Sequence, residues 1–459
     1  MRSQIPPTIR DSASGHWPLV IGHWSLVIVN CSLFIVLILL LPLALPGCER
    51  ITPTPESPLP TPIPSPLRPT PTLTPTREAQ PMIVTLGLWL PEELSPYSQR
   101  PGAATLAQQL DDFSDAYPDV QVEVTIKKAR GRGGLLDFLR TARDAAPSIL
   151  PDLIVLDAAE LATAAGSGLI QPLDSLLSPT QLNDRFPFAT ELGMVEGQAL
   201  GFVIGVDMQH LAYRPTVFES RPVSWTQIIS PPVPFLFPAG GHDRQINDAT
   251  LIQYMAAGGK LTDQDGRPWL DADVMVKVLS FYSTCVGTGT ISPTVVLKIA
   301  DPDQSWEQFL AGESDMAVVR ARRYWLEADE TIAAAPIPTR DGRPFSIARG
   351  WALAMVADDP ARQALAQLLL DWLIASDHSA QWTQTAGYLP GTRGALRMWD
   401  VPSTDRAVLH SVMEAAVPPP RPEAINTAGR VMQEALEAVL RRRVSPEAAA
   451  AAAIESLGQ

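Results

Sequence analysis

The sequence predicts an α/β fold with a parallel sheet, and three segments carry this prediction. The continuous apolar runs at 82–89 and 152–157 suit strands that are covered on both faces. Valine and isoleucine alternate with polar residues over 120–126, as in a strand that is half-covered. Segments with helical spacing separate these runs. The order strand, helix, strand, helix, strand is typical of parallel α/β units.

The two intervening helices are expected at 104–117 and 135–143. The first presents one apolar face, made by Leu106, Leu110, Phe113 and Tyr117. Pro118 ends this helix, because proline cannot donate the next backbone hydrogen bond.

The second half of the chain is expected to add more helices and shorter strands. A helix over 271–284 begins at Asp271, whose carboxylate suits the N-cap position. The last helix begins at Ser445 with Pro446 in its first turn. The other expected elements are a loop at 230–241, strands at 316–319 and 350–356, and a helix at 360–375.

Composition and charge exclude several kinds of partner and site. The 459 residues include 35 Lys and Arg against 49 Asp and Glu, for a formal charge of −14. Nucleic-acid binding needs clustered cations, so no such partner is expected. Cys31, Cys48 and Cys285 give no disulfide framework and no zinc spacing. Neither a metal ion nor a cofactor is expected.

Residues 1–47 are expected to be a signal peptide or a signal-anchor. Residues 17–45 contain no Asp, Glu, Lys or Arg, and this length can span a bilayer as a helix. "LPGC", ending at Cys48, resembles a bacterial lipobox, in which the cysteine is lipidated and becomes the new N-terminus. Pro46 departs from the usual small residue. A lipoprotein and an uncleaved membrane helix both remain open, and both place the body outside the cytoplasm.

Residues 48–81 are expected to be a linker that follows the anchor. Ten prolines lie within 51–76, mostly after Thr or Ser. This composition favours extended polyproline II, which would span roughly 80 Å at about 3.1 Å per residue. The sequence therefore predicts a semi-rigid spacer between the membrane and the body.

The body, residues 82–459, resembles the extracellular solute-binding proteins of ABC importers, in the carbohydrate-binding, maltose-binding-protein-like family 1. The most specific stretch is "PDLIVLDAAELATAAGSGLIQPLDSLL" at 151–177, with a strand ending in Asp, a helix, and a Gly-Leu-Ile, Pro-Leu segment. Further matches in the family's order lie at 113–124, 197–219, 306–319, 349–356 and 385–396. Arg214 and Arg349 depart from the family pattern.

The resemblance implies a type II periplasmic-binding-protein-like fold, in which two α/β lobes joined by a hinge close on a ligand in the cleft between them. One lobe would comprise about 82–206 and 347–400, and the other 207–346 and 401–459. The resemblance further implies a monomer, held at the outer face of the cell membrane, that binds a mono- or oligosaccharide. Its partners would be the permease subunits of an ABC importer.

Candidate ligand-binding residues in the first half lie at strand ends and near the crossover between lobes. Trp89 could stack on the apolar face of a sugar or cap the core. Asp157 could bind hydroxyl groups or cap the following helix. Asp207 could bind the ligand or make a structural hydrogen bond. Glu92 and Glu93 follow the first strand, where such residues are usually solvated.

Four more candidates come from the second half. Arg349 and Trp351 fall where the family's Gly-Gly-Trp strand faces the cleft. Tyr388 lies in a loop near the cleft mouth, and Trp325 follows the basic segment "RARRY". Each of these side chains could instead be a core or a solvated residue.

The chain is expected to bind its solute without catalysis. It has no Gly-x-Ser-x-Gly, no phosphate loop and no His-Glu-x-x-His. A carboxylate pair of the glycosidase kind is not excluded by counting. A solute-sensing receptor module and, after it, a secreted carbohydrate-active hydrolase are the alternatives to transport.

Overall fold

The computed structural model describes residues 83–241 and 243–458. All of them belong to one compact unit, residues 78–459. The predicted membrane segment, Cys48 and the linker lie outside the described residues. Among the residues that are described, no helix combines the length and the apolar character needed to cross a membrane.

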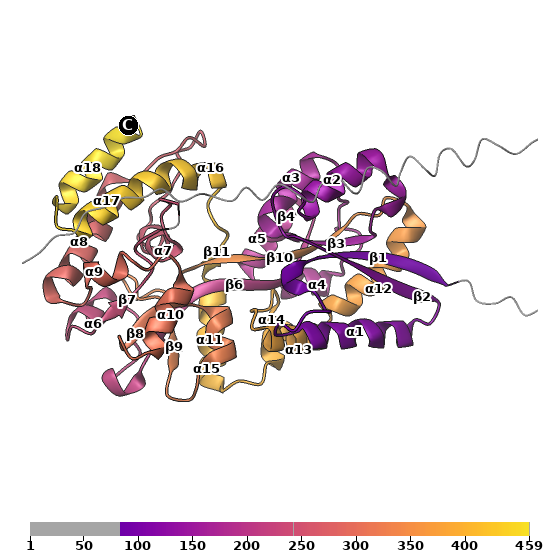
Figure 1. The fold of residues 1–459 in the computed structure, drawn as a ribbon, viewed down its shortest axis with the longest axis horizontal. Helices are drawn as coiled ribbons and strands as arrows, with labels where there is room; N and C mark the ends of the chain where they lie inside the picture. Colours follow the sequence, from indigo (N-terminus) through magenta and orange to yellow (C-terminus); the bar gives the residue numbers. More distant parts are fainter. Residues whose placement is uncertain (1–82, 242, 459) are drawn as a thin grey trace, which may run out of the picture. The chain divides into compact units, whose positions relative to one another are not determined.

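A nine-stranded sheet runs through the unit in the order β2-β1-β3-β10-β6-β8-β7, with β11 beside β10 and β9 beside β6 (Figure 1). Its strands are β1 (Val84–Pro91), β2 (Val120–Lys127), β3 (Leu153–Asp157), β6 (Phe202–Tyr213), β7 (Phe235–Leu236), β8 (Met316–Arg320), β9 (Ala333–Ala335), β10 (Ser346–Met355) and β11 (Ala416–Val417). A separate hairpin is formed by β4 (Met194–Val195) and β5 (Gln198–Ala199).

The helices surround this sheet (Figure 1), and several of them begin at a Ser, Thr, Asp or Asn whose side chain caps the helix. In the first half they are α1 (Ala103–Ala116), α2 (Leu135–Ala145), α3 (Leu161–Gly166), α4 (Pro179–Asp184), α5 (Pro187–Gly193), α6 (Trp225–Ile229) and α7 (Asp248–Ala256). In the second half they are α8 (Ala272–Thr288), α9 (Pro293–Val296), α10 (Pro302–Leu310), α11 (Ala321–Glu327), α12 (Pro360–Ile374), α13 (Ser376–Ala386), α14 (Arg393–Met398), α15 (Ser403–Glu414), α16 (Pro422–Ala424), α17 (Arg430–Leu440) and α18 (Pro446–Ser456). The predicted caps Asp271 and Ser445 accept the backbone N–H of Val274 and Ala448, respectively.

The first three strands are parallel, as the strand and helix order predicts. β1 pairs with β2 along its whole length and with β3 at Leu88 and Trp89. The sheet as a whole is mixed, because β10 runs antiparallel to both β3 and β6. The carboxyl ends of β1, β2 and β3 therefore meet at one edge, and β10 crosses beside them.

Two long strands, β6 and β10, connect the segments on either side of the sheet's centre. The first half of β6 pairs with β10, from Phe202 to Met208. Its second half, from Gln209 to Tyr213, pairs with β8 and in part with β9. β10 pairs with β3 near its carboxyl end and with β11 at its start. Two of the three predicted lobe boundaries fall within these strands, and the third, between 400 and 401, lies between α14 and α15. The division into lobes stays a prediction.

Two hydrophobic clusters cover the faces of the sheet around β1 and β3. One cluster holds Leu88 and Leu90 of β1 together with the apolar side of α1 and α12. The other holds Trp89 and Ile154 with α2 and α3, and extends through β6 and β8 to α7, α8, α17 and α18. In Figure 1, α1 and α12 lie on one side of β1 and α2 and α3 on the other. The continuous apolar runs of β1 and β3 follow from this burial on both faces.

The structure confirms most predicted elements and corrects two. β7 lies inside the segment 230–241 that was expected to be a loop. β10 begins at Ser346, earlier than the predicted start at 350. Both strands extend a sheet through residues whose local pattern carries little strand signal, so tertiary pairing decides their conformation.

Candidate functional site

A hollow of about 400 Å³ opens at the carboxyl ends of β1 and β2 beside β10. Its lining residues are Glu92, Glu93, Lys128, Ala129, Arg130 and Trp351. Ligands of α/β sheets commonly bind outside the carboxyl ends of the strands, where loops can supply polar side chains. Together these residues offer two carboxylates, two cations and one indole in a single concave surface.

Chain order explains how these side chains converge. Glu92 and Glu93 begin the short 3₁₀ helix that follows β1 directly. Lys128 and Arg130 follow β2, which ends at Lys127 and is parallel to β1. Trp351 comes from β10, where it lies opposite the last residue of β3. Three segments far apart in sequence thus place their side chains at the same edge.

Trp351 and Tyr388 form the aromatic part of the site. Trp351 is 9% exposed and belongs to the same hydrophobic cluster as Tyr388. The ring of Tyr388 stacks on Trp382 at a centroid distance of 5.9 Å, and the Arg322 guanidinium lies 4.5 Å from its centroid. Burial raises the pKa of the Tyr388 phenol, so the hydroxyl stays protonated.

Asp157 lies behind the hollow and makes structural contacts. Its side chain accepts the backbone N–H of Ala159 at 2.9 Å, which is the capping role that the sequence offered as one alternative. It also forms an ion pair with Arg130, which lines the hollow. Burial raises the pKa of nearby Glu160, and the positive charge of Arg130 partly offsets this shift.

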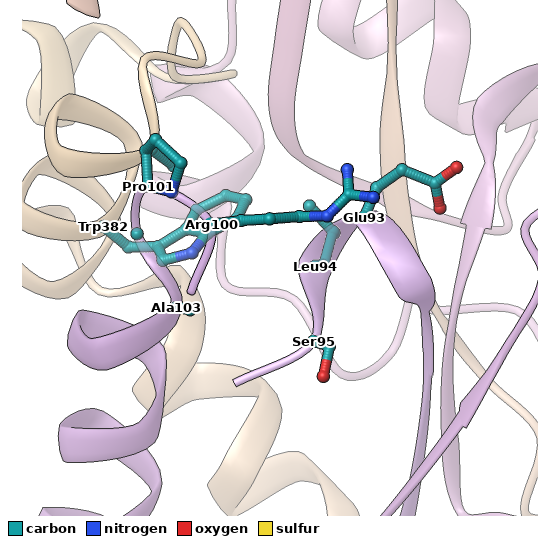
Figure 2. Close-up of a pocket in the computed structure, with 9 residues that line it drawn as sticks. Glu93, Leu94, Ser95, Arg100, Pro101, Ala103 and Trp382 are labelled. Carbon is teal, nitrogen blue, oxygen red and sulfur yellow. The ribbon is translucent and has the colours of Figure 1, made fainter. Parts of the chain in front are cut away.

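Glu93 presents a buried carboxylate oxygen to the site. Its Oε2 atom is shielded from solvent and has no hydrogen-bond partner among the described residues. The side chain also borders a second, small cavity of about 10 Å³, which Figure 2 shows between Arg100, Trp382 and the start of α1. That volume holds about one water molecule, so of these two cavities the larger hollow is the one with room for a solute.

Asp207 and Arg349 are direct neighbours across β6 and β10. Asp207 accepts the backbone N–H groups of Met208 at 3.0 Å and Arg322 at 3.1 Å. Burial raises its pKa, and the charge of Arg320 opposes this shift. Arg349 binds both carboxylate oxygens of Asp248 at 2.8–2.9 Å and stays 42% exposed. Both predicted residues therefore already have protein partners.

Trp89 and Trp325 do not line the hollow. Trp89 is 3% exposed and packs against Phe138 with ring centroids 4.9 Å apart, which is the core position that the sequence offered as one alternative. Trp325 is half-buried and lies edge-on to Trp399 at 5.9 Å.

The structure brings together residues that sequence reasoning left out of the site. The sequence pattern predicts that Glu92 and Glu93 are solvated, and it indicates no role for Lys128 and Arg130. The signal available was their position, since each pair directly follows one of two adjacent parallel strands. Within the described part of the chain, no cluster of His, Cys, Asp and Glu is suited to hold a metal ion.

Comparison with known proteins gives a family match and many fold matches. The sequence model described as "Bacterial extracellular solute-binding protein" matches residues 108–406. A search of curated protein sequences found no match to this chain.

Solved structures share the fold over most of the chain. The cyclic α-maltosyl-1,6-maltose binding protein of Arthrobacter globiformis is 18% identical, with a TM-score of 0.63 over 82% of this chain and 98% of its own. A family 1 extracellular solute-binding protein of Alicyclobacillus acidocaldarius is 14% identical, with a TM-score of 0.64 over 83% and 98%. An ABC transporter solute-binding protein of Thermotoga lettingae, bound to α-D-tagatose, is 20% identical, with a TM-score of 0.59 over 81% and 98%. The fold is that of the type II periplasmic-binding-like proteins.

Proposed function

We propose, from the premise that this chain belongs to the bacterial extracellular solute-binding protein family, that it captures a carbohydrate outside the cytoplasm for an ABC importer. The membrane-embedded permease subunits of that importer would be its protein partners. Solved proteins of the same fold include one that binds a cyclic maltosyl-maltose and one bound to tagatose.

The observation that carries the proposal is the composition of the hollow. Trp351 offers an apolar face for the C–H groups of a sugar ring. Glu92, Glu93 and Lys128 offer acceptors and a donor for its hydroxyl rim. About 400 Å³ lies within the range of small-molecule sites and has room for a mono- or disaccharide. We propose Trp351 and Glu93, which line the hollow, as solute contacts. Tyr388, Asp207 and Arg349 do not line it in this structure, and we propose them as groups that would reach the solute on closure.

The chain would leave its solute chemically unchanged. Binding proteins of this kind deliver a solute by closing around it and opening at the permease, and closure needs a hinge. In this proposal the paired strands β6 and β10 would supply the two connections of such a hinge. Incubation with a bound oligosaccharide, followed by mass spectrometry, would reveal hydrolysis if the site were catalytic.

The N-terminal sequence suggests where capture takes place. Lipidation of Cys48 would anchor the body to the outer face of the membrane, with residues 51–76 as a spacer. A tether of that length raises the local concentration of the binding protein at its permease. Mass spectrometry of the mature N-terminus tests the anchor, because diacylglycerol would be found on Cys48 and lost in Cys48→Ala.

A thermal-shift screen of mono- and oligosaccharides tests the function. A sugar at 100 times its Kd stabilises the folded state by about 2.7 kcal/mol, which is a shift of several degrees. Trp351→Phe should reduce this shift, whereas Trp269→Phe, in a residue that does not line the hollow, should preserve it. Stabilisation by an amino acid or a polyamine, and by no sugar, would overturn carbohydrate capture.

A further inference from the structure

We infer that Asp157 is a positioning residue for the solute site: its ion pair with Arg130 holds the loop at 128–134 in place as one wall of the hollow. Arg130 lines the hollow, and Asp157 binds it without lining the hollow itself. The significance of this ion pair for sugar binding rests on the proposed function, although the position of the loop can be measured without a solute.

The loop at 128–134 connects β2 to α2 and forms a large part of the hollow. It supplies three of the six lining residues, which are Lys128, Ala129 and Arg130. Its two ends are held together, because the backbone N–H of Leu135 donates to the carbonyl oxygen of Lys128 at 2.9 Å. The base of the loop is therefore fixed by backbone bonding, and the position of its tip depends on other contacts.

The tip of the loop has little packing of its own. Gly131 and Gly133 have φ values of 75° and 76°, which let the chain reverse direction here. Beyond the chain neighbours, no atom lies within 4 Å of a Cβ built at either glycine. The backbone N–H of Gly133 donates to Asp137 Oδ2 at 2.8 Å, which is a bond to the helix that follows directly. Among the residues that the structure describes, Arg130 is the one member of this loop that forms an ion pair.

Asp157 is placed to hold Arg130 from the end of β3. It is 5% exposed, and an unpaired charge at such a position would be costly. Its Oδ1 atom accepts the backbone N–H of Ala159 at 2.9 Å, and its Oδ2 atom binds the Arg130 guanidinium. Asp157 also lies directly opposite Trp351 on β10. The ion pair thus fixes the loop relative to the indole that lines the hollow.

The two partners of this ion pair differ in exposure, and this difference sets the expected size of its effect. The side chain of Arg130 is 63% exposed, whereas that of Asp157 is 7% exposed. Exposed ion pairs contribute little, and breaking a buried one is costly, so we expect an intermediate, roughly fivefold effect on loop opening. A guanidinium has five N–H donors, so Arg130 can bind Asp157 and still donate to a solute.

Asp157→Asn separates the ion pair from the helix cap. Asparagine keeps an oxygen that can accept the Ala159 N–H, but it carries no charge. Arg132 provides the matched control for Arg130, because it is an exposed arginine of the same loop that does not line the hollow. A general effect of charge near the hollow would be shared by Arg130→Gln and Arg132→Gln.

The test is hydrogen–deuterium exchange, read by mass spectrometry, on the full chain in detergent without sugar. The amides of Gly133, Gly134 and Leu135 report on the loop, because each donates a hydrogen bond within it or at its base. Asp157→Asn and Arg130→Gln should each accelerate this exchange roughly fivefold. The double change should add nothing further, and Arg130→Lys should have a smaller effect because lysine keeps the charge.

Arg132→Gln should leave the exchange of these amides unchanged. Wild-type exchange in Asp157→Asn or in Arg130→Gln would overturn the inference. Full additivity in the double change would overturn it as well, because the two side chains would then act independently. Equal acceleration in Arg132→Gln would have the same consequence, since charge in general, and not this ion pair, would control the loop.

Calorimetry with maltose and D-tagatose as probes extends the test to binding. Asp157→Asn should weaken the binding of whichever sugar the wild type takes roughly fivefold, in parallel with loop opening. Weaker binding with wild-type loop exchange would overturn the inference, because Asp157 would then act as a direct solute contact, while carbohydrate capture would stand. If the wild type takes neither sugar, that result counts against carbohydrate capture, and the loop exchange alone then decides the role of Asp157.

Discussion

His210, on β6, is a buried imidazole whose charge state should couple stability to pH. It is 4% exposed, and its Nδ1–H donates to the carbonyl oxygen of Leu211 at 3.0 Å. Nε2 has no partner among residues 83–241 and 243–458. Burial lowers its pKa from 6.5 to about 4. Between these values the unfolded chain binds the extra proton and the folded chain does not.

We therefore expect the free energy of unfolding to fall as the pH falls from 6.5 towards 4, by up to about 3 kcal/mol from this residue. His210→Phe keeps the edge-on ring contact with Tyr324 and should remove this part of the pH dependence. Urea unfolding at a series of pH values measures it. His410→Gln, at a position 52% exposed, is the control and should leave the slope in place. A wild-type slope in His210→Phe would contradict the assignment.

Arg362 neutralises a buried carboxylate beside β1 and β3. Its Nε–H donates to Asp152 Oδ1 at 2.8 Å, and Asp152 Oδ2 accepts the backbone N–H of Gly87 at 2.8 Å. Asp152 is 4% exposed, so removing Arg362 would leave a buried carboxylate without its cationic partner. Arg362→Ala should cost about 2 kcal/mol in urea unfolding, a value reduced because the arginine is 38% exposed.

A double-mutant cycle separates the ion pair from other effects of the arginine. Asp152→Asn with Arg362→Ala should cost less than the sum of the two single changes. Arg430→Ala breaks an exposed i,i+4 pair with Glu434 and should cost about 0.5 kcal/mol or less. Strict additivity in the cycle would show that the Asp152 pair does not contribute.

Single residues show how far sequence reasoning could define the site. Trp351 was predicted from its motif, and it does line the hollow. Trp89 was predicted from its place at a strand end, but β1 continues to Pro91 and alternation directs the ring to the core. No sequence motif marks Arg322 as a neighbour of Tyr388. The two residues are far apart in the sequence and come together only in the folded protein.

Between elements, β6 and β10 approach each other closely at Gly350. A Cβ atom on Gly350 would lie 2.6 Å from the carbonyl oxygen of Gly205 and 2.6 Å from Val206 Cγ1. The pairing register also shifts between Trp351 and Ala352. An alanine side chain would force the two strands apart beside Trp351, which lines the hollow.

Gly350→Ala should therefore destabilise the protein by about 1–3 kcal/mol and weaken sugar binding. Urea unfolding and calorimetry measure the two effects. Gly287→Ala is the matched control, because Gly287 lies within α8 with nothing within 4 Å of a new Cβ. That change should be neutral or stabilising by about 0.5–1 kcal/mol. Equal costs for both would show that the strand contact is not tight.

Elements with strong periodicity could be predicted from sequence, and short ones could not. The apolar stripe of α1 and the cap of α8 mark both helices clearly. β7 is two residues long and lies between prolines, so its conformation is set by its pairing with β8. Pairing partners distant in the chain leave no local trace in the sequence.

At the scale of the whole molecule, the proposed capture of a sugar predicts that the protein becomes more compact when the sugar binds. If the segments on either side of β6 and β10 close around a sugar, saturating sugar should lower the radius of gyration measured by solution X-ray scattering. Trp351→Phe at the same sugar concentration should show a smaller change, because less of it is bound. An unchanged radius for a sugar that binds would exclude closure as the mode of capture.

The family and the α/β fold could be inferred from the order of motifs along the chain. The sharing of one sheet by both proposed lobes could not, because it depends on β6 pairing with β10 across a large sequence separation. The same limit applies to the hollow, whose walls come from three separate segments.

Because the nine-stranded sheet is continuous, we expect the body to unfold as one cooperative unit. The first half of β6 pairs with β10, and its second half pairs with β8. If the strands on one side unfold, β6 therefore loses hydrogen bonds that help to keep it in place for the strands on the other side. Heating should then give a single calorimetric peak, and a nick in an outer loop should release no half that stays folded alone.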